Sequence, residues 1–187
     1  MGTSRTFSIA AAAGCLTLLA ACGGNGATMA SADRPTAIFN AADVTFAQMM
    51  VPHHEQAVEM GDLASTRASS PDVKTIADKI NAAQEAEIQT MKDWLSQWGK
   101  SAPADSMGHD MPGGMSRQDM DRLQAANGKA FDKRYVQLMI VHHEGAIKMA
   151  RTEQADGANP AAKKLARKIA SSQQAEVAEL QKILAHL

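Results

Sequence analysis

Cysteine, aromatic residues and net charge are all scarce in this chain of 187 residues. It contains two cysteines, 4% aromatic residues and a formal net charge of −1. This charge balance gives no indication that the protein binds nucleic acid or an anionic membrane. The sequence also lacks a Gly-rich phosphate loop, a nucleophile–base motif and a basic patch with interleaved aromatic residues. We therefore expect a binding protein rather than an enzyme, with no catalytic residues.

Long apolar runs are also missing, with one exception near the N-terminus. Arg5 precedes an apolar stretch over residues 7–21, which is too short for a membrane-spanning helix and indicates a secretory signal. The stretch runs into Leu-Ala-Ala-Cys at residues 19–22, which looks like the lipobox of bacterial lipoproteins. The sequence thus predicts a signal peptide over 1–21 and a protein anchored through acylated Cys22 to the extracytoplasmic side of the cell envelope. An ordinary cleavage site beside an incidental cysteine is the alternative.

The shortage of cysteine limits how the mature chain can be stabilised. Cleavage would remove Cys15, so Cys22 would remain as the only cysteine and no internal disulfide could form. Residues 22–42 are rich in Gly, Ala, Ser, Asn and Thr, which is typical of a flexible tether. The domain that follows must be stabilised by packing or by a metal ion.

Residues 43–187 contain helical segments separated by breaks with Pro or Gly, and no segment alternates with the period of a β-strand. Asp43 is the expected N-cap of the first helix. A Gly/Pro/Met loop is expected over 100–115, followed by a short helix over 116–126. The main helices are expected over 43–67, 72–98, 129–155 and 160–187.

An internal repeat is the strongest feature of the sequence. When the chain is shifted by 89 residues, positions 46–95 align with 135–184 without a gap, and 16 of the 50 pairs are identical. The motif His-His-Glu at 53–55 recurs at 142–144. We therefore predict an all-α fold in which two copies of one antiparallel helical hairpin pack face to face as a four-helix bundle with a pseudo-two-fold axis. The first copy covers about 43–98 and the second about 129–187.

Polar residues occupy the centres of the apolar stripes in both copies. At 100° per residue, His53 lies in the middle of its stripe and His54 at the edge. Glu87 lies at the centre of the stripe on the next helix, and a buried carboxylate requires a partner. His53 and Glu87 are about equally far from the hairpin turn, so we expect them to pair, as we expect for His142 and Glu176.

Three interpretations of these residues stay open. The His–Glu pairs could be purely structural, in a helical scaffold or interaction module. The histidines could instead bind a soft metal ion together with thioethers one helical turn away, with copper, as Cu(I), favoured. A ferritin-like di-metal oxidase is the third interpretation, and it is less favoured because Glu55 and Glu144 are expected to point outward. In the metal interpretation, four residues would orient the metal-ligating side chains by hydrogen bonding to them without touching the metal: Glu87, Glu176, Gln84 and Gln173.

The loop over 100–115 is a second candidate for a soft-metal site. It carries three methionines and a histidine where no core is expected, and an exposed thioether gains little from water. The alternative is that the loop merely tolerates these residues. The candidate ligands are Met107, His109, Met111 and Met115.

The segments 50–60, 84–95 and 139–150, together with the Gly/Met-rich linker, resemble the bacterial domain of unknown function 305 family over about 39–187. The resemblance implies a ferritin-like helical fold and an exported protein, and some members are linked to copper tolerance or copper binding. It also implies sequestration or handover of copper, with other envelope copper proteins as possible partners. Gly145 stands where the first copy has Gln56, and the loop has fewer methionines and histidines than the Met-rich, copper-linked members, which disfavours high-capacity storage. By position, the implied metal ligands are His53, His54, Met50, Met60, His142, His143, Met139 and Met149.

Overall fold

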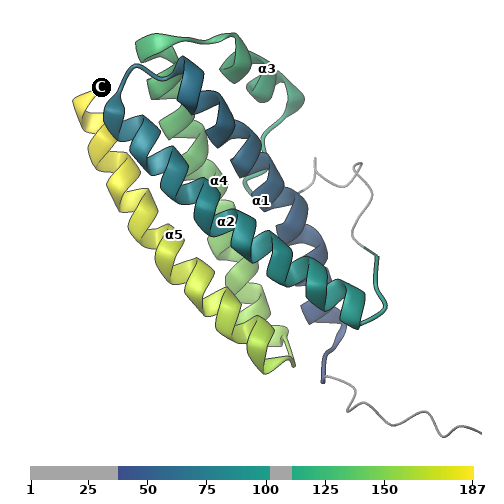
Figure 1. Ribbon diagram of the computed structural model, residues 1–187. Coiled ribbons are helices and arrows are strands. Elements are labelled where there is room, and N and C mark those ends of the chain that lie inside the picture. Colours follow the sequence, from purple (N-terminus) through teal and green to yellow (C-terminus); the bar gives the residue numbers. More distant parts are fainter. Residues whose placement is uncertain (1–37, 102–110) are drawn as a thin grey trace, which may run out of the picture. The chain divides into compact units, whose positions relative to one another are not determined.

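The computed structural model describes residues 38–101 and 111–187, all of whose regular elements are helices (Figure 1). Within these residues there is no β-strand, and the predicted all-α fold is confirmed. None of the described helices is long and apolar enough to span a membrane. The expected signal peptide, Cys22, Met107 and His109 lie outside the described residues. The helices are α1 (Ala41–Arg67), α2 (Pro71–Gln97), α3 (Arg117–Ala125), α4 (Gly128–Asp156) and α5 (Pro160–His186).

The helix ends follow the punctuation of the sequence, with one correction at the start of α1. Pro71 and Pro160 occupy the first turns of α2 and α5, where a missing N–H costs nothing. The N-cap of α1 is Asn40 rather than Asp43. The Asn40 side chain accepts a hydrogen bond from the Asp43 N–H at 3.1 Å, and the Asp43 carboxylate accepts one from the Asn40 N–H at 2.6 Å. Asp43 is therefore the acidic third residue of a capping box.

Two antiparallel hairpins, α1–α2 and α4–α5, make up the bundle, and they meet mainly through contact between α1 and α4 (Figure 1). The short helix α3 lies against α1 and α4. Apolar side chains form two clusters, one centred on Phe131, Tyr135 and Ile80, the other on Phe46, Met91 and Ile169. The predicted pair of hairpins is confirmed.

Each hairpin fixes the turn of the other through a buried aspartate. Asp43 on α1 accepts hydrogen bonds from the N–H groups of Ala158 and Asn159, in the turn between α4 and α5. Asp132, which is 89 residues later on α4, accepts them from the N–H groups of Ser69 and Ser70, between α1 and α2. Both carboxylates are 0% exposed. These reciprocal bonds satisfy backbone donors at the helix starts and show that the repeat is a two-fold relation in space.

A buried acid, Glu153, breaks this symmetry at one end of the bundle. It is 1% exposed and lies beside Asp43, whereas the matching position in the first repeat is Ala64. Burial, and next the neighbouring Asp43 carboxylate, raise the pKa of Glu153 to about 8. Burial opposes ionisation of Asp43 as well, but its backbone hydrogen bonds hold its pKa below the ordinary value. Glu153 is therefore protonated in the folded protein at neutral pH.

The wild-type protein is expected to lose stability as the pH rises, because Glu153 ionises, and replacing Glu153 with glutamine is expected to abolish this loss. The pKa of Glu153 is raised on folding from 4.5 to about 8, so the folded state binds one more proton than the unfolded state between these values. Its contribution to stability is complete below pH 4.5 and is lost as pH rises towards 8. Asp43 is ionised in both states throughout this window. At pH 8 the free energy of unfolding of the variant should exceed that of the wild type by on the order of 2 kcal/mol. At pH 4.5 the variant should not be the more stable protein.

Urea unfolding of both proteins at several pH values tests this expectation. The informative quantity is the difference between variant and wild type, because contributions from the other titrating groups near Glu153, Asp156 and Lys163, are common to both. A difference that does not change between pH 5 and pH 8 would contradict the raised pKa.

Candidate metal centre

Four histidines form a dry layer where the two repeats meet. His53 and His54 come from α1, His142 and His143 come from α4, and all four are 0% exposed. His53 and His142 face each other across the α1–α4 contact, with ring centroids 3.7 Å apart and ring planes inclined by 33°. The pseudo-two-fold relation therefore brings the paired motifs together at one place in the bundle.

The glutamates pair with the second histidine of each motif, which corrects the prediction that His53 and His142 would be their partners. His54 Nε2 lies 3.0 Å from a Glu87 carboxylate oxygen, and His143 Nε2 lies 2.9 Å from one of Glu176. Consecutive helical residues differ by about 100° in direction. The first histidine of each pair thus points to the other repeat and the second to its own hairpin partner, so His54 is buried rather than at an edge.

The electrostatics of the layer favour neutral imidazoles beside an ionised carboxylate. Burial lowers the pKa of His53 to about 3 and that of His142 well below its ordinary value. Burial also lowers the pKa of His54, against the opposing effect of Glu87. Burial raises the pKa of Glu87, but the hydrogen bond from His54, together with the Lys168 ammonium at 3.3 Å, brings it below the ordinary value. A neutral imidazole that donates from Nε2 keeps the Nδ1 lone pair free.

Within residues 38–101 and 111–187, many buried polar atoms in and near this layer have no hydrogen-bond partner. Five ring nitrogens lack one: Nδ1 of all four histidines and Nε2 of His142. Both amide atoms of Gln84 and the amide oxygen of Gln173 are unpartnered too. Buried polar groups are almost always satisfied in folded proteins, so such a concentration indicates a place that binds something. Neutral imidazole nitrogens are common metal ligands, and the donor set therefore fits a metal ion.

The chemistry of the donors narrows the kind of metal. No three His, Cys, Asp or Glu side chains of residues 38–101 and 111–187 are arranged around one point as a metal-binding group. Glu55 and Glu144 are exposed, as predicted, and Glu55 pairs with Lys92 at 2.6 Å. The four histidines therefore do not converge on one point either, so an ion held here would need thioethers beside the imidazoles, and that combination of donors suits a soft ion.

The four methionines of the predicted site are buried on both sides of the histidine layer. Met50 and Met149 belong to one apolar cluster, and Met60 and Met139 to the other. In the repeat, Met50 corresponds to Met139 and Met60 to Met149. Each cluster therefore holds one methionine that precedes a histidine pair and one that follows the histidine pair of the other repeat. The structure thus places two of the predicted methionines, one from each repeat, in each of the two apolar clusters.

The loop methionines behave differently from the expectation that no core surrounds them. Met111 is 6% exposed and Met115 is 5% exposed, and Met115 packs in the same cluster as Met60 and Met139. Residues 111–115 and α3 pack against α1 and α4. The linker therefore rejoins the bundle at these two methionines. Apolar packing accounts for Met115, and Met111 is buried as well.

Residues 111–115, which we call the strap, lie over the histidine layer. The Pro112 carbonyl accepts a hydrogen bond from His53 Nε2 at 3.0 Å. Gln56 holds the strap by accepting from the Met115 N–H at 2.6 Å and donating to the Met115 carbonyl at 3.0 Å. On the opposite side, a Cβ at Gly145 would overlap the Pro112 carbonyl and Gly113. Gly145 therefore makes room for the strap.

Sequence reasoning missed Pro112, Gln56 and Asp132 as residues that shape this site. The difference between Gln56 and Gly145 within otherwise matching motifs was the available sign of the strap, because one position binds it and the other makes room for it. The matched spacing of Asp43 and Asp132 was the sign of the reciprocal capping.

A family model described as Domain of unknown function (DUF305) matches residues 43–184. The chain belongs to the DUF305 family. A comparison with curated proteins gave no significant match. The expected resemblance to the family is therefore confirmed, and the paired motifs of this DUF305 protein lie inside the matched region.

Solved structures of DUF305 proteins share the fold. One from Streptomyces coelicolor, described as a candidate secreted protein, is 32% identical with a TM-score of 0.73, covering 78% of this chain and 93% of that one. A DUF305 fragment from Deinococcus radiodurans is 27% identical with a TM-score of 0.73, covering 79% and 98%. CopM in its Cu(II)-bound form is 34% identical with a TM-score of 0.68, covering 77% and 96%. CopM has also been solved with Cu(I) and with silver.

Proposed function

We propose that this protein binds Cu(I), or the chemically similar Ag(I), in the histidine layer between its two repeats and so sequesters copper or hands it on. The observation that carries this proposal is the set of five unpartnered ring nitrogens on four buried histidines. CopM, which has been solved with copper and with silver at 33–34% identity, supports the same class of ligand.

The candidate donors are the ring nitrogens of His53, His54, His142 and His143. Glu87 and Glu176 accept from Nε2 of the second histidine in each motif, which fixes the tautomer and leaves Nδ1 as the donor. Gln84 and Gln173 border the layer with free amide atoms. The candidates to complete the coordination are buried thioethers on the same two helices as the histidines: Met50, Met60, Met139 and Met149.

Two other functions have less support. A purely structural role explains the two His–Glu bonds but leaves five buried nitrogens without a purpose. A di-metal oxidase needs several inward carboxylates, and Glu87 and Glu176 are already engaged by histidines. We therefore favour binding over catalysis.

We further propose that the protein works outside the cytoplasm, anchored through Cys22. This rests on the apolar segment and lipobox-like sequence at 7–22, and a relative is described as a candidate secreted protein. Other copper proteins of the envelope would then be its partners.

An anaerobic titration with Cu(I) against a competing chelator tests the function. The protein should carry Cys15→Ser and Cys22→Ser, so that no thiol binds copper. We expect saturable binding at one or two ions per chain, with Zn(II) binding more weakly because the thioethers favour a soft ion. Loss of binding only in the variant with Met107, Met111 and Met115 changed to leucine would place the site in the linker. No binding by the parent protein would reject the proposal.

A further inference from the structure

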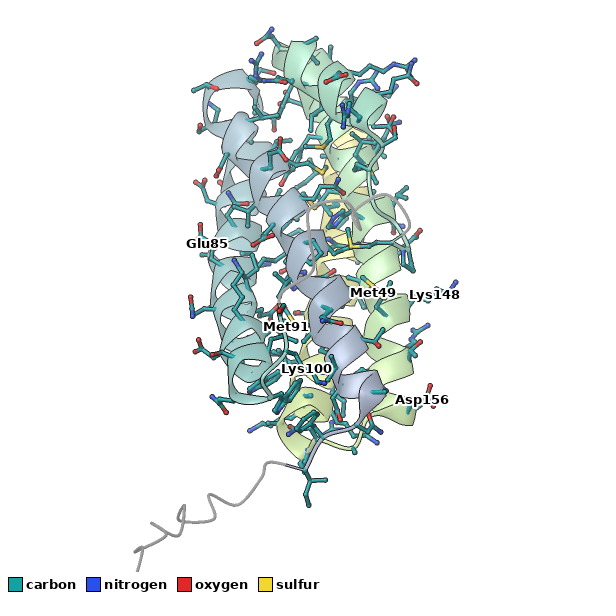
Figure 2. The ribbon with its side chains drawn as sticks, turned by 90° about the vertical axis from the view of Figure 1, so that its right-hand side faces the viewer. Met49, Glu85, Met91, Lys100, Lys148 and Asp156 are labelled. Atoms are coloured by element: carbon teal, nitrogen blue, oxygen red, sulfur yellow. The ribbon has the colours of Figure 1, made fainter. Side chains whose placement is uncertain are left out.

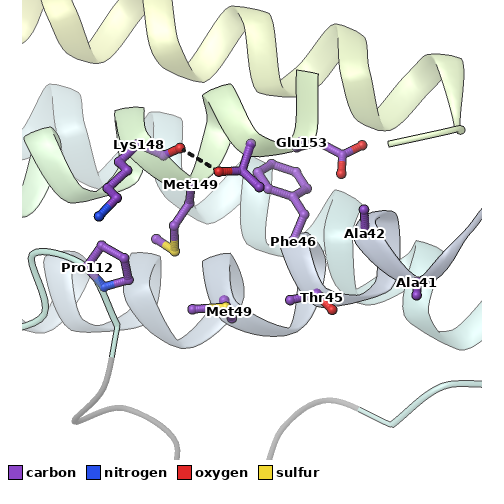
Figure 3. A pocket seen from close by; sticks show the side chains of 10 residues that line it. Ala41, Ala42, Thr45, Phe46, Met49, Pro112, Lys148, Met149 and Glu153 are labelled. Carbon is purple, nitrogen blue, oxygen red and sulfur yellow. Dashed lines mark hydrogen bonds between the residues drawn. The ribbon is translucent and has the colours of Figure 1, made fainter. Parts of the chain in front are cut away.

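A hollow of about 390 Å³ opens between α1 and α4, beside the strap. Phe46 and Met49 line it from α1, Met149 and Glu153 from α4, and Pro112 from the strap (Figure 3). The Pro112 carbonyl also accepts from His53. Pro112 therefore lines the hollow and also contacts the histidine layer, so the hollow and the layer lie next to each other.

The two-fold repeat should produce this hollow twice, yet its counterpart is filled. Phe46, Met49 and Met149 correspond to Tyr135, Leu138 and Met60. Tyr135 and Met60 are 0% exposed and pack in one cluster with Met115 of the strap and Leu123 of α3. The linker thus covers one of two equivalent grooves and leaves the other open.

Both grooves hold thioethers, but those of the covered groove, Met60 and Met115, are buried in an apolar cluster, whereas Met49 in the open groove is partly exposed. Met49 is half-buried and Met149 is 7% exposed, and in Figure 3 both side chains project from facing helices into the space beside Pro112. Figure 2 shows Met49 on α1 and Lys148 on α4 along the same face of the bundle. In the covered groove, Leu138 replaces Met49. Apolar packing serves equally well with leucine, whereas binding of a soft ion requires the sulfur.

The geometry points to the open groove as a second Cu(I) or Ag(I) site, where Met49 and Met149 hold the ion before it passes to His53. The transfer of the ion to His53 rests on the proposed function, whereas the binding of an ion by the two thioethers does not. Passage is a ligand exchange from two sulfurs to imidazole nitrogen with no change in oxidation state. With fewer and more exposed donors, this site binds more weakly than the histidine layer, as suits a site of passage.

The site can be tested without the histidine layer by NMR of protein labelled at the methionine methyl carbons. In full-length protein carrying Cys15→Ser, Cys22→Ser, His53→Ala and His142→Ala, we expect Ag(I) to shift the methyl signals of Met49 and Met149. The signal of Met91, which is buried in the same apolar cluster on α2, is the control and should not shift. Absence of shifts at Met49 and Met149 would overturn the inference, whereas shifts there, in a protein whose Cu(I) affinity does not fall when His53 and His142 are replaced, would reject only the proposed function.

The path is tested by the rate at which Cu(I) leaves a chelator complex for the protein. Changing Met49 to leucine should slow this transfer about fivefold or more while the equilibrium affinity changes less than about twofold. Met149 is kept in this variant because it is also a candidate ligand of the histidine layer. Met91→Leu should alter neither quantity. An equal loss in rate and affinity would make Met49 a ligand of the core site, and an unchanged rate would exclude the groove as the path; either result overturns the inference.

Discussion

Replacing His53 and His142 together with alanine is expected to weaken Cu(I) binding by at least about 100-fold. The expectation has a physical basis, because even the outer partners of ligating histidines change affinity by roughly 10–100-fold. These two rings provide three of the five unpartnered nitrogens and meet across the repeat contact at 3.7 Å. Chelator competition under anaerobic conditions measures the loss.

The controls for this experiment separate binding from folding. His186 is exposed at the end of α5, and its replacement with alanine should leave the affinity unchanged. Glu87→Gln with Glu176→Gln keeps every imidazole but removes the charge that fixes the tautomer, so we expect an intermediate loss of roughly 10–100-fold. Circular dichroism should show that all variants remain helical. If the double histidine variant binds as tightly as its parent, the core site is wrong.

The helices and their pairing were predictable because local chemistry determines them. Proline at the first turn, a polar cap before it and a 3.6-residue apolar period repeat in both halves, and the observed ends of α2 and α5 differ from the expected ones by only one residue. The repeat then implied two hairpins, since neither could bury its apolar stripe alone. Fold class therefore followed from patterns within about thirty residues of each other.

The choice of histidine partner was not predictable from a single stripe. A helical-wheel argument assigns one buried face to a helix, but α1 contacts both α2 and α4. Its buried surface is wide enough for two consecutive histidines, and each faces a different neighbour. The distance from the hairpin turn correctly predicted the height along the bundle at which histidine and glutamate meet. Which of the two histidines faces the glutamate depends on the side of α1 against which the second repeat packs.

The strap was even less accessible, because its residues have no helical period. Its position depends on bonds between residues 59 positions apart, such as Gln56 with Met115. Composition alone therefore suggested exposed methionines where the structure has buried ones.

Some of the differences between the repeats lie beside the linker. Of the 50 aligned pairs 16 are identical, and three of the pairs that differ border the linker or the open groove: Gln56 with Gly145, Met49 with Leu138, and Ala64 with Glu153. A two-fold bundle has two equal grooves, and one linker can cover only one of them. The asymmetry of the linker thus gives a structural reason for the differences at these three pairs.

The largest effect on folding is expected from Gly145→Ala. A Cβ at this position would overlap the backbone of Pro112 and Gly113, and backbone cannot move aside as a side chain can. The strap must shift, which breaks the His53–Pro112 bond and strains both bonds between Gln56 and Met115. Even after the gain in helix propensity, we expect a loss of about 2–4 kcal/mol in the free energy of unfolding.

Gly61→Ala is the matched control for this substitution, because Gly61 is also a buried glycine inside a helix. There the new Cβ meets only the side chain of Asn81, which is half-buried and can rotate away, so the gain in helix propensity should offset most of the loss and keep the change within about 1 kcal/mol. Urea unfolding gives both values, and the backbone amide signal of Met115 should move in Gly145→Ala alone. Equal stabilities for the two variants would mean that the strap does not rest on Gly145, and that His53 is not covered in the way described.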